Sequence, residues 1–311
     1  MSIIKFLSQE LSLDPNSLRN YISSSPHRYK VYKIPKRNGK GSRVIAQPAK
    51  ELKYLQKLVA KKYLRELPVH ESAMAYKKKT GIRDNVERHV KNKYILKMDF
   101  TNYFPSIKPN DLIAHIQRHL DLDLGEEDVD TLSRLFFYDK NRTKELSLSI
   151  GAPTSPEISN TIMYDFDVQT YEACMKNDIV YTRYADDLTL STNTKNILFN
   201  YPNVVSKILQ ELSYPVLSLN SEKTVFLSPS GNRHITGLVL TNEGEISLGR
   251  KKKRYIRSLL YQYSRGMLEE EQVSYLRGYL SFCSDIEPQF VSRLKDKYGS
   301  ALLERIRKQT D

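Results

Sequence analysis

The feature that most constrains this chain is a pair of adjacent acids in the turn of an apolar hairpin. Residues 179–184 and 188–191 are rich in β-branched and aromatic side chains, which predicts two strands, and only Ala185, Asp186 and Asp187 separate them. Adjacent carboxylates repel each other, so the pair lowers stability unless a cation neutralises it. We therefore expect an antiparallel sheet whose hairpin turn presents two carboxylates to a metal ion.

A third acid, Asp99, ends another predicted strand, which covers residues 94–98. Asp99 converges with the Asp186–Asp187 turn if the strands are neighbours in one sheet. Oxygen ligands without His or Cys suit Mg²⁺, with Mn²⁺ as an alternative, and two ions about 3.5–4 Å apart would activate a 3′-hydroxyl and stabilise a leaving pyrophosphate. The other interpretation is a solvated acidic turn, and the residues alone leave both open.

The rest of the chain mixes strand and helix patterns, which predicts an α+β fold. The patterns predict short helices up to residue 23, a hairpin over 29–47 with a basic turn at 36–41, helices over 50–67, 110–137 and 157–176, a strand at 216–219, and a hairpin from 235–240 and 245–248. From Arg250 onward the pattern is helical. We therefore expect a mixed domain over residues 1–248 and a small helical domain over 249–311.

The charge balance narrows the class of partner. Lys and Arg number 49 against 36 Asp and Glu, a net charge of +13, which favours nucleic acid first and an anionic membrane surface second. No apolar stretch is long enough to span a membrane, and the N-terminal segment lacks the pattern of a signal peptide. The two cysteines, Cys174 and Cys283, predict neither a disulfide framework nor a zinc site. A transmembrane protein is excluded, and a reducing cytoplasm is favoured.

Several motifs, taken in order, resemble the retron branch of the bacterial reverse transcriptases. Residues 181–191, centred on Tyr-Ala-Asp-Asp, resemble the catalytic turn, and residues 99–106 resemble the first catalytic-acid motif. The other matches are residues 43–53 in the fingers, 85–89 at the retron Asn-Ala-x-x-His signature, 151–156 at the template- and substrate-contacting motif, 220–224 in the palm, and 235–237 at the retron Val-Thr-Gly signature. The resemblance therefore covers nearly the whole chain.

The chain departs from the family pattern at a few positions. Ile150 stands where the family usually has a Gln that helps to position the template base or the nucleotide, so fidelity or template geometry is in question. Val86 for Ala and Ile235 for Val are mild apolar changes. The resemblance implies a right-hand polymerase fold, with N-terminal helices, fingers and palm over residues 1–248 and a helical thumb over 249–311.

The resemblance also implies roles for the acids and their surroundings. Asp99, Asp186 and Asp187 are implied to bind the metal ions, with the backbone carbonyl of Phe100 as a further ligand and a less direct role for Asp187. Phe104 is implied to lie beneath the sugar, where its ring leaves no room for a 2′-hydroxyl. The alternative for Phe104 is an ordinary core aromatic.

Other residues are candidates for nucleotide binding. Arg43, in the basic fingers hairpin, would clamp the triphosphate, because a guanidinium binds phosphate bidentately. Gly151 and Ala152 are small enough to let the backbone approach nucleotide and template, although an ordinary loop would look the same. Lys223 would donate a proton to pyrophosphate or orient phosphates, or it is a surface lysine.

The candidates for RNA and DNA binding fall into two groups. A basic run either contacts phosphates or is a solvated face, and it comprises Arg250, Lys251, Lys252, Lys253, Arg254 and Arg257. The resemblance links the retron signatures to recognition of a structured RNA and to its branched priming, and their candidate residues are Asn85, His89, His234, Thr236 and Gly237. For His89 a structural role in the core is the alternative.

The resemblance implies an RNA-directed DNA polymerase of the bacterial cytoplasm, with no membrane partner, that uses deoxynucleoside triphosphates. It would bind a cognate structured non-coding RNA and start synthesis from the 2′-hydroxyl of a guanosine in that RNA. The branched product, multicopy single-stranded DNA (msDNA), would serve anti-phage defence together with an accessory effector or toxin protein. The chain length leaves no room for an RNase H domain, so a host RNase H is expected to trim the template.

Two alternatives remain open from the sequence. One is another bacterial reverse transcriptase, of the group II intron type or the diversity-generating type. The other is a catalytically idle RNA-binding scaffold that restrains a toxin, against which the three intact acids argue.

Overall fold

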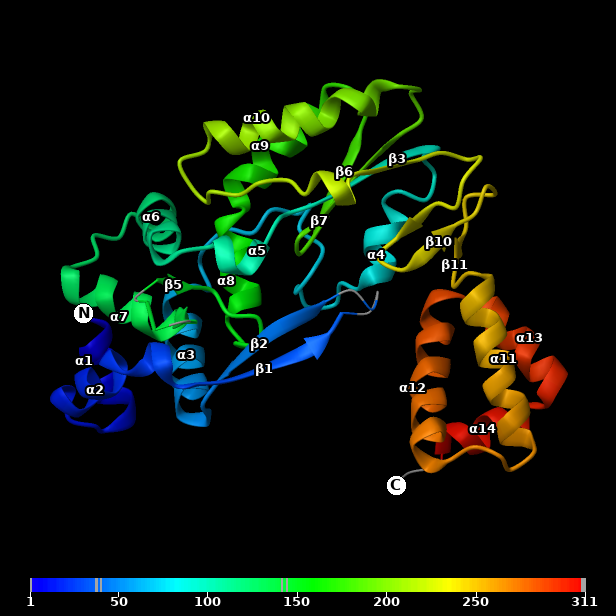
Figure 1. Ribbon diagram of the computed structural model, residues 1–311, viewed down its shortest axis with the longest axis horizontal. Coiled ribbons are helices and arrows are strands. Elements are labelled where there is room, and N and C mark those ends of the chain that lie inside the picture. The colour runs from blue at the N-terminus through cyan, green and yellow to red at the C-terminus, as the bar shows by residue number, and fades with distance from the viewer. Residues whose placement is uncertain (1, 37–38, 40, 141, 144, 309–311) are drawn as a thin grey trace. The chain divides into compact units, whose positions relative to one another are not determined.

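The computed structural model describes residues 2–36, 39, 41–140, 142–143 and 145–308 (Figure 1). The chain groups into two compact units: the first combines Met1–Lys79, Leu96–Leu190 and Asn196–Val225, and the second combines Thr80–Ile95, Ser191–Lys195 and Phe226–Asp311. The second unit thus takes in segments that precede residue 248, so compact units and the expected domains do not coincide. The division into fingers and palm over residues 1–248 and a thumb over 249–311 remains a prediction.

The first unit begins with the expected N-terminal helices, α1 (Ile3–Leu11) and α2 (Pro15–Ser23). The Asp14 carboxylate accepts a hydrogen bond from the Ser17 N–H at 2.9 Å, and Pro15 occupies the first turn, which explains why α2 starts there. The expected hairpin follows as β1 (Tyr29–Pro35) and β2 (Ser42–Pro48), antiparallel from Tyr29 opposite Pro48 to Pro35 opposite Ser42. Part of its basic turn, residues 37, 38 and 40, lies outside the described residues.

Helices cover the rest of the first unit. They are α3 (Lys50–Tyr63), α5 (Tyr103–Ser106), α6 (Pro109–Leu120), α7 (Glu126–Phe136), α8 (Ser155–Ile162), α9 (Tyr164–Met175) and α10 (Tyr201–Glu211), with 3₁₀ turns at Ser25–His27, Ile197–Asn200 and Ser221–Lys223. A small pair, β4 (Tyr138–Asp139) and β5 (Leu146–Ser147), lies before α8. The single helix expected at 157–176 is wrong in one respect: it divides at Met163, whose ψ of 4° is not helical.

The central sheet has the strand order β6-β7-β3-β8. Its strands are β3 (Tyr94–Asp99), β6 (Val180–Tyr184), β7 (Asp187–Thr192) and β8 (Val225–Leu227). Most residues of β3 and β7 are buried, as expected for the two inner strands of the sheet. The sheet thereby confirms the expected neighbourhood of the strand that ends at Asp99 and the hairpin that carries Asp186 and Asp187 (Figure 1).

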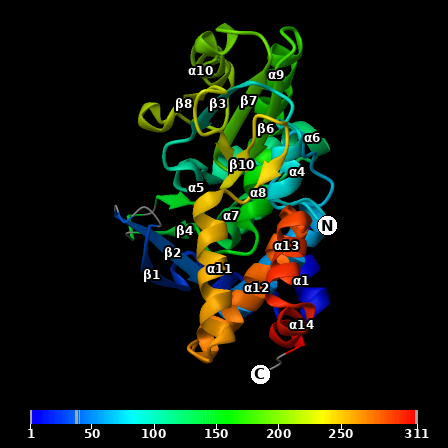
Figure 2. The same ribbon diagram turned by 90° about the vertical axis from the view of Figure 1, so that its right-hand side faces the viewer.

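The second unit contains α4 (Ile82–Glu87), the short strands β9 (His234–Ile235), β10 (Leu238–Leu240) and β11 (Ile246–Ser247), and a C-terminal helical bundle. The bundle comprises α11 (Arg250–Ser264), α12 (Glu270–Ile286), α13 (Pro288–Tyr298) and α14 (Ser300–Lys308), which Figure 2 shows packed side by side. One apolar core joins these elements, from Val86 on α4 through Leu260 on α11 to Phe290 on α13. This bundle confirms the helical pattern expected after Arg250.

Two strand predictions are wrong. Residues 216–219 form no strand: Val216 is 80% exposed, and the segment meets the end of β3 around Leu219, which makes an isolated antiparallel bridge to Phe100. The strand expected at 235–240 is broken by a turn at Thr236 and Gly237, whose φ angles are 44° and 82°. Glycine adopts the second of these without strain. Within the described residues, no helix has the length and apolar character needed to cross a membrane.

Candidate active site

The three acids meet where the central strands end. The turn between β6 and β7 consists of Ala185 and Asp186, and its Asp186 carbonyl accepts a hydrogen bond from the Phe100 N–H at 3.2 Å. On the other side of β3, the Asn220 N–H donates to the Asp99 carbonyl at 2.7 Å. These backbone bonds hold Asp99 beside the hairpin turn and explain the convergence that the sequence predicts.

The carboxylates are crowded and partly desolvated. Burial, followed by the charge of Asp99, raises the pKa of Asp186. Burial, followed by the charges of Asp186 and Asp99, raises the pKa of Asp187 to about 6. The surroundings therefore disfavour the ionised form of both side chains, an effect that a bound cation would offset.

Lys223 forms an ion pair with one of these acids: its Nζ lies 2.7 Å from Asp99 Oδ1, although the lysine side chain is 57% exposed. The charges of Lys223 and Arg43 lower the pKa of Asp186, and that of Lys97 lowers the pKa of Asp187. Burial and the neighbouring acids outweigh these cations and keep both pKa values raised, which fits a site for a divalent cation. The carboxylate oxygens of the three acids do not all lie within 4.8 Å of one another. A different cluster of His and Asp side chains in the described chain is this compact. A bound ion would therefore draw these carboxylates together.

A pocket of about 550 Å³ opens beside Asp186. Its lining includes Arg43 from β2, Phe104 from α5, Ile150 and Lys223, so it gathers most of the residues expected to bind the nucleotide. The described residues that line this pocket include no His or Cys, and its acid is a hard oxygen donor. The donor set and the basic groups together suit a metal-bound triphosphate.

Gly151 is needed for the contact between this pocket and the fingers hairpin. Its φ is +128°, and a Cβ there would lie 2.9 Å from the Ala46 carbonyl oxygen. The Ala46 N–H donates to the Ile150 carbonyl at 2.8 Å, so the two segments are joined by backbone. Ala152 is buried and is not among the lining residues of the pocket. The small side chains thus serve close packing in this structure.

Arg183 is a residue that the sequence reasoning missed. It lies fully buried on β6, pairs with the fully buried Asp167 at 2.6 Å, and donates from Nη1 to the Ala185 carbonyl at 3.2 Å. The guanidinium therefore supports the turn that carries Asp186. A charged residue in an apolar strand, three positions before Asp186, was the signal that could have found it, because Arg is almost never fully buried unless it is paired.

The two retron signatures, residues 85–89 and 235–237 with the adjacent His234, differ in how far their side chains are buried. Asn85 and His89 are fully buried, and His89 Nδ1 lies 2.7 Å from Ser191 Oγ. Burial lowers the pKa of His89 to about 3. Direct RNA contact by these two side chains, which the sequence predicted, is thus incompatible with this conformation, and the structural alternative for His89 accounts for its position. His234 is exposed, and Thr236 is half-buried.

The first part of the basic run lines a hollow of about 810 Å³. The hollow is lined by His234, Gly237 and the first residues of α11, Arg250, Lys251, Lys252 and Lys253. Lys252 Nζ donates to the Gly237 carbonyl at 2.5 Å, and Lys253 pairs with Glu287 at 2.6 Å. Arg254 and Arg257 are exposed. Lys252 and Lys253 therefore bind groups within the second unit, whereas the exposed Arg254 and Arg257 are accessible to a polyanion.

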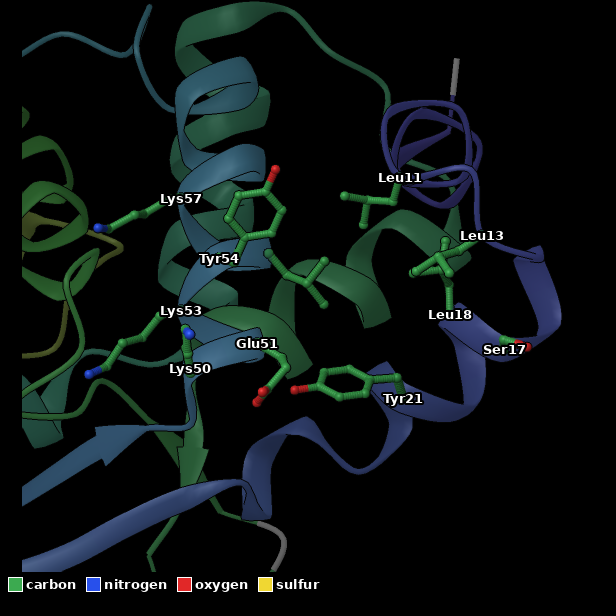
Figure 3. A pocket seen from close by; sticks show the side chains of 11 residues that line it. Leu11, Leu13, Ser17, Leu18, Tyr21, Lys50, Glu51, Lys53, Tyr54 and Lys57 are labelled. Atoms are coloured by element: carbon green, nitrogen blue, oxygen red, sulfur yellow. The ribbon is translucent and has the colours of Figure 1, made fainter.

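A further groove of about 830 Å³ lies in the first unit, and it contains none of the acids. Figure 3 shows Leu11 and Leu18 of the N-terminal helices facing Tyr54 of α3, with Tyr21 and Glu51 at one end. Its lining is mainly apolar. This groove is larger than the pocket beside Asp186, so the volume of a pocket does not by itself identify the candidate active site.

The comparison with protein families agrees with the site. The family described as reverse transcriptase (RNA-dependent DNA polymerase) matches residues 34–276, and the chain belongs to this family. The match covers the hairpin with the acids, Asp99 and the pocket. The chain is accordingly an RNA-directed DNA polymerase, and its α+β fold is that of a reverse transcriptase.

Its similarity to individual proteins narrows the branch to the retron reverse transcriptases. The retron Ec83 reverse transcriptase of Escherichia coli is 38% identical over 285 residues, which cover 91% of each chain. The retron Ec73 reverse transcriptase of the same organism is 32% identical over 288 residues, 89% of each chain. The retron Ec86 reverse transcriptase, also from Escherichia coli, is 28% identical over 96% of this chain and 91% of that relative.

Proposed function

We propose that this chain copies part of a cognate structured non-coding RNA into DNA by two-metal nucleotidyl transfer. Synthesis starts from a guanosine 2′-hydroxyl of that RNA and gives branched msDNA for anti-phage defence. The observation that carries the proposal is the pocket beside Asp186, where Arg43, Phe104 and Lys223 lie around an acid that is held at the end of the central strands.

Two Mg²⁺ ions, or Mn²⁺ in their place, supply charge neutralisation for the attacking hydroxyl and the leaving pyrophosphate. Asp99 and Asp186 are the principal ligands in this proposal, and the Phe100 carbonyl adds an oxygen. Asp187 acts less directly. The all-oxygen donor set supports hard divalent cations over softer ones.

The pocket residues orient the nucleotide. Arg43 clamps the triphosphate bidentately. The Phe104 ring lies beneath the sugar and excludes a 2′-hydroxyl, so deoxynucleotides are selected. Lys223, which pairs with Asp99 in the absence of ions, moves to the phosphates and orients them or protonates the leaving pyrophosphate. Gly151 and Ala152 let the backbone reach nucleotide and template, next to Ile150.

The second unit grips the nucleic acid. The exposed basic residues around α11 contact phosphates, so they determine affinity and salt dependence more than sequence choice. His234, Thr236 and Gly237 contribute to recognition of the structured RNA, whereas Asn85 and His89 support them from within the core. A host RNase H trims the template, and an accessory effector is restrained by the complex of enzyme and msDNA in the bacterial cytoplasm.

The test is extraction of nucleic acid from cells that express the gene with its flanking DNA. After RNase treatment, the wild type is expected to yield a short discrete single-stranded DNA whose 5′ linkage persists until debranching. Asp186→Asn should abolish the band, whereas Asp123→Asn, the same change at an exposed acid, should leave it. Primer extension in vitro is measured in parallel on each purified protein.

The outcomes separate the alternatives. Extension in vitro without a branched product in cells would contradict retron priming and point to a group II intron or diversity-generating type. A wild type that extends no primer and yields no band, yet protects cells against phage as well as Asp186→Asn does, would support the idle scaffold that restrains a toxin.

A further inference from the structure

A second cluster of potential metal ligands lies in the first unit, away from the three acids. His115 and His119 are one turn apart on α6, with ring centroids 4.4 Å apart, and both face Asp165 at the start of α9. One ligand atom from each of the three residues lies within 4.8 Å of the other two. His115 is fully buried, while the side chains of His119 and Asp165 are 16% and 13% exposed, which gives an ion a route from solvent.

The hydrogen bonds of His115 fix its tautomer. The Thr161 hydroxyl donates its proton to the Pro68 carbonyl at 2.9 Å, so it can only accept from His115 Nε2, which lies 2.9 Å away. His115 therefore carries its proton on Nε2 and turns the lone pair of Nδ1 towards the cluster. Metal-binding histidines are oriented in this way, by a hydrogen bond from the other ring nitrogen.

The Tyr214 hydroxyl occupies the remaining corner of the cluster. It lies 3.2 Å from His115 Nδ1 and 3.4 Å from Asp165 Oδ2, and its single proton can serve only one of them. His119 Nε2 lies 3.3 Å from the same Asp165 oxygen. The separation from His115 Nδ1 is at the upper end of the usual range for hydrogen bonds between nitrogen and oxygen, about 2.7–3.2 Å, and the other two separations exceed the usual lengths for their atom types.

Those separations match a tetrahedral metal site. Zinc bonds of about 2.0–2.1 Å to nitrogen and oxygen place neighbouring ligand atoms of a tetrahedron about 3.3–3.4 Å apart. We propose that His115, His119, Asp165 and Tyr214 form a binding site for a zinc ion that fastens α6 to α9 and to the segment after α10, with Tyr214 binding as the phenolate after its proton is released to solvent. Arg118, whose Nε lies 3.4 Å from Asp165 Oδ2, is 55% exposed, so it can turn to solvent when the ion binds.

The position of the site suggests what the ion would support. The segment that starts at Tyr214 leads to Ser218, whose carbonyl accepts from the Thr101 N–H at 2.9 Å, and to Asn220, which bonds Asp99. An ion at this cluster would therefore anchor the chain that holds the polymerase acids from one side. The ion takes no part in the reaction, and the proposal stands whether or not the product is msDNA.

The test is titration of chelator-treated protein with Co²⁺, read by visible absorption. Tetrahedral Co²⁺ gives an intense band, whereas octahedral Co²⁺ on carboxylates and water gives a weak one. The wild type is expected to bind one Co²⁺ per chain with the intense band, and Zn²⁺ should displace it. The same band in Asp186→Asn/Asp187→Asn would exclude the polymerase acids as its source.

His119→Gln removes one ligand at a partly exposed position, and His27→Gln, an exposed histidine of the same unit, is its matched control. His119→Gln should weaken Co²⁺ affinity more than about tenfold, since even outer partners of metal ligands contribute about 10–100-fold. Saturating Zn²⁺ should raise the Tm of the wild type and the control by about 5 °C and that of His119→Gln by much less.

Either of two results would overturn the proposal. One is an octahedral spectrum, or no bound ion, in the wild type itself, a reading that does not depend on the folding of any variant. The other is an intense band that His119→Gln leaves unchanged.

Discussion

Replacing Asp187 by Asn should stabilise the metal-free protein while it lowers polymerase activity. Burial and the neighbouring acids raise the pKa of Asp187 from 3.8 to about 6, so the folded protein binds this proton more tightly than the unfolded chain does. Stability is then greatest below about pH 4, falls as the pH rises towards about 6, and stays lower above it. The difference between the two pKa values corresponds to about 3 kcal/mol at neutral pH.

The measurement is thermal unfolding in the presence of a chelator from about pH 4 to about pH 8, for wild type, Asp187→Asn and the control Asp123→Asn. A gain of about 3 kcal/mol is expected to raise the Tm of Asp187→Asn by about 6 °C at neutral pH and to vanish near pH 4. Asp123 is exposed, so its replacement should move the Tm by little at any pH.

Divalent ions provide the second half of this test. Mg²⁺ should raise the Tm of the wild type, because it neutralises the carboxylates that repel one another, and should raise that of Asp187→Asn less. The reasoning would be refuted by an Asp187→Asn protein that is no more stable than the wild type at neutral pH, or by a gain of the same size at pH 4. Either result would mean that the acids do not strain the fold.

Three further expectations follow from the structure. Phe104→Ala should admit ribonucleotides, measured as the ratio of kcat/KM for the two nucleotide types, and unchanged discrimination would exclude the ring as the gate. Arg183→Met should lower the free energy of unfolding by about 3–5 kcal/mol, because it leaves Asp167 buried and unpaired. The double variant Arg183→Met with Asp167→Leu should recover part of that stability, and a double variant as unstable as the single one would count against the ion pair. Replacing Lys251 and Arg254 by Ala should weaken RNA binding and reduce the slope of log affinity against log salt by about 1–2. The control Lys295→Ala on α13 should leave the slope unchanged. Equal slopes in all three proteins would show that the basic run does not contact RNA.

The parts of the fold that the sequence predicted are those set by short-range patterns. The fingers hairpin, the strand that ends at Asp99 and the turn with Asp186 follow from the alternation of apolar residues and from turn residues. The strand expected at 216–219 did not form, because an apolar pattern predicts a strand only where a partner is free to pair, and this segment meets the end of β3 around Leu219, over residues 218–220.

Burial is what the motifs could not predict. The Asn85 to His89 signature identifies a branch of the family, yet a match between sequences does not say which side chains face solvent. Here the second unit encloses both residues, and Ser191, more than a hundred positions away, supplies the partner of His89. The His115 cluster was missed for the same reason, because Asp165 and Tyr214 join it only through the packing of α6 against distant segments.

Arg183 shows how the turn can hold two acids and still leave them available to a cation. An arginine three positions before Asp186 would be expected to neutralise the acids, but its charge is already matched by Asp167 at 2.6 Å in a fully buried pair. The charges that lower the pKa of Asp186 come instead from Lys223 and Arg43, which lie at the pocket. Removing either partner of such a buried pair would leave the other charge buried and unpaired, at a cost of about 3–5 kcal/mol, so Arg183 stays paired with Asp167. The structure thus separates the charge that supports the turn from the charges that meet the substrate, so ions and nucleotide can replace Lys223 at Asp99 without loosening the hairpin.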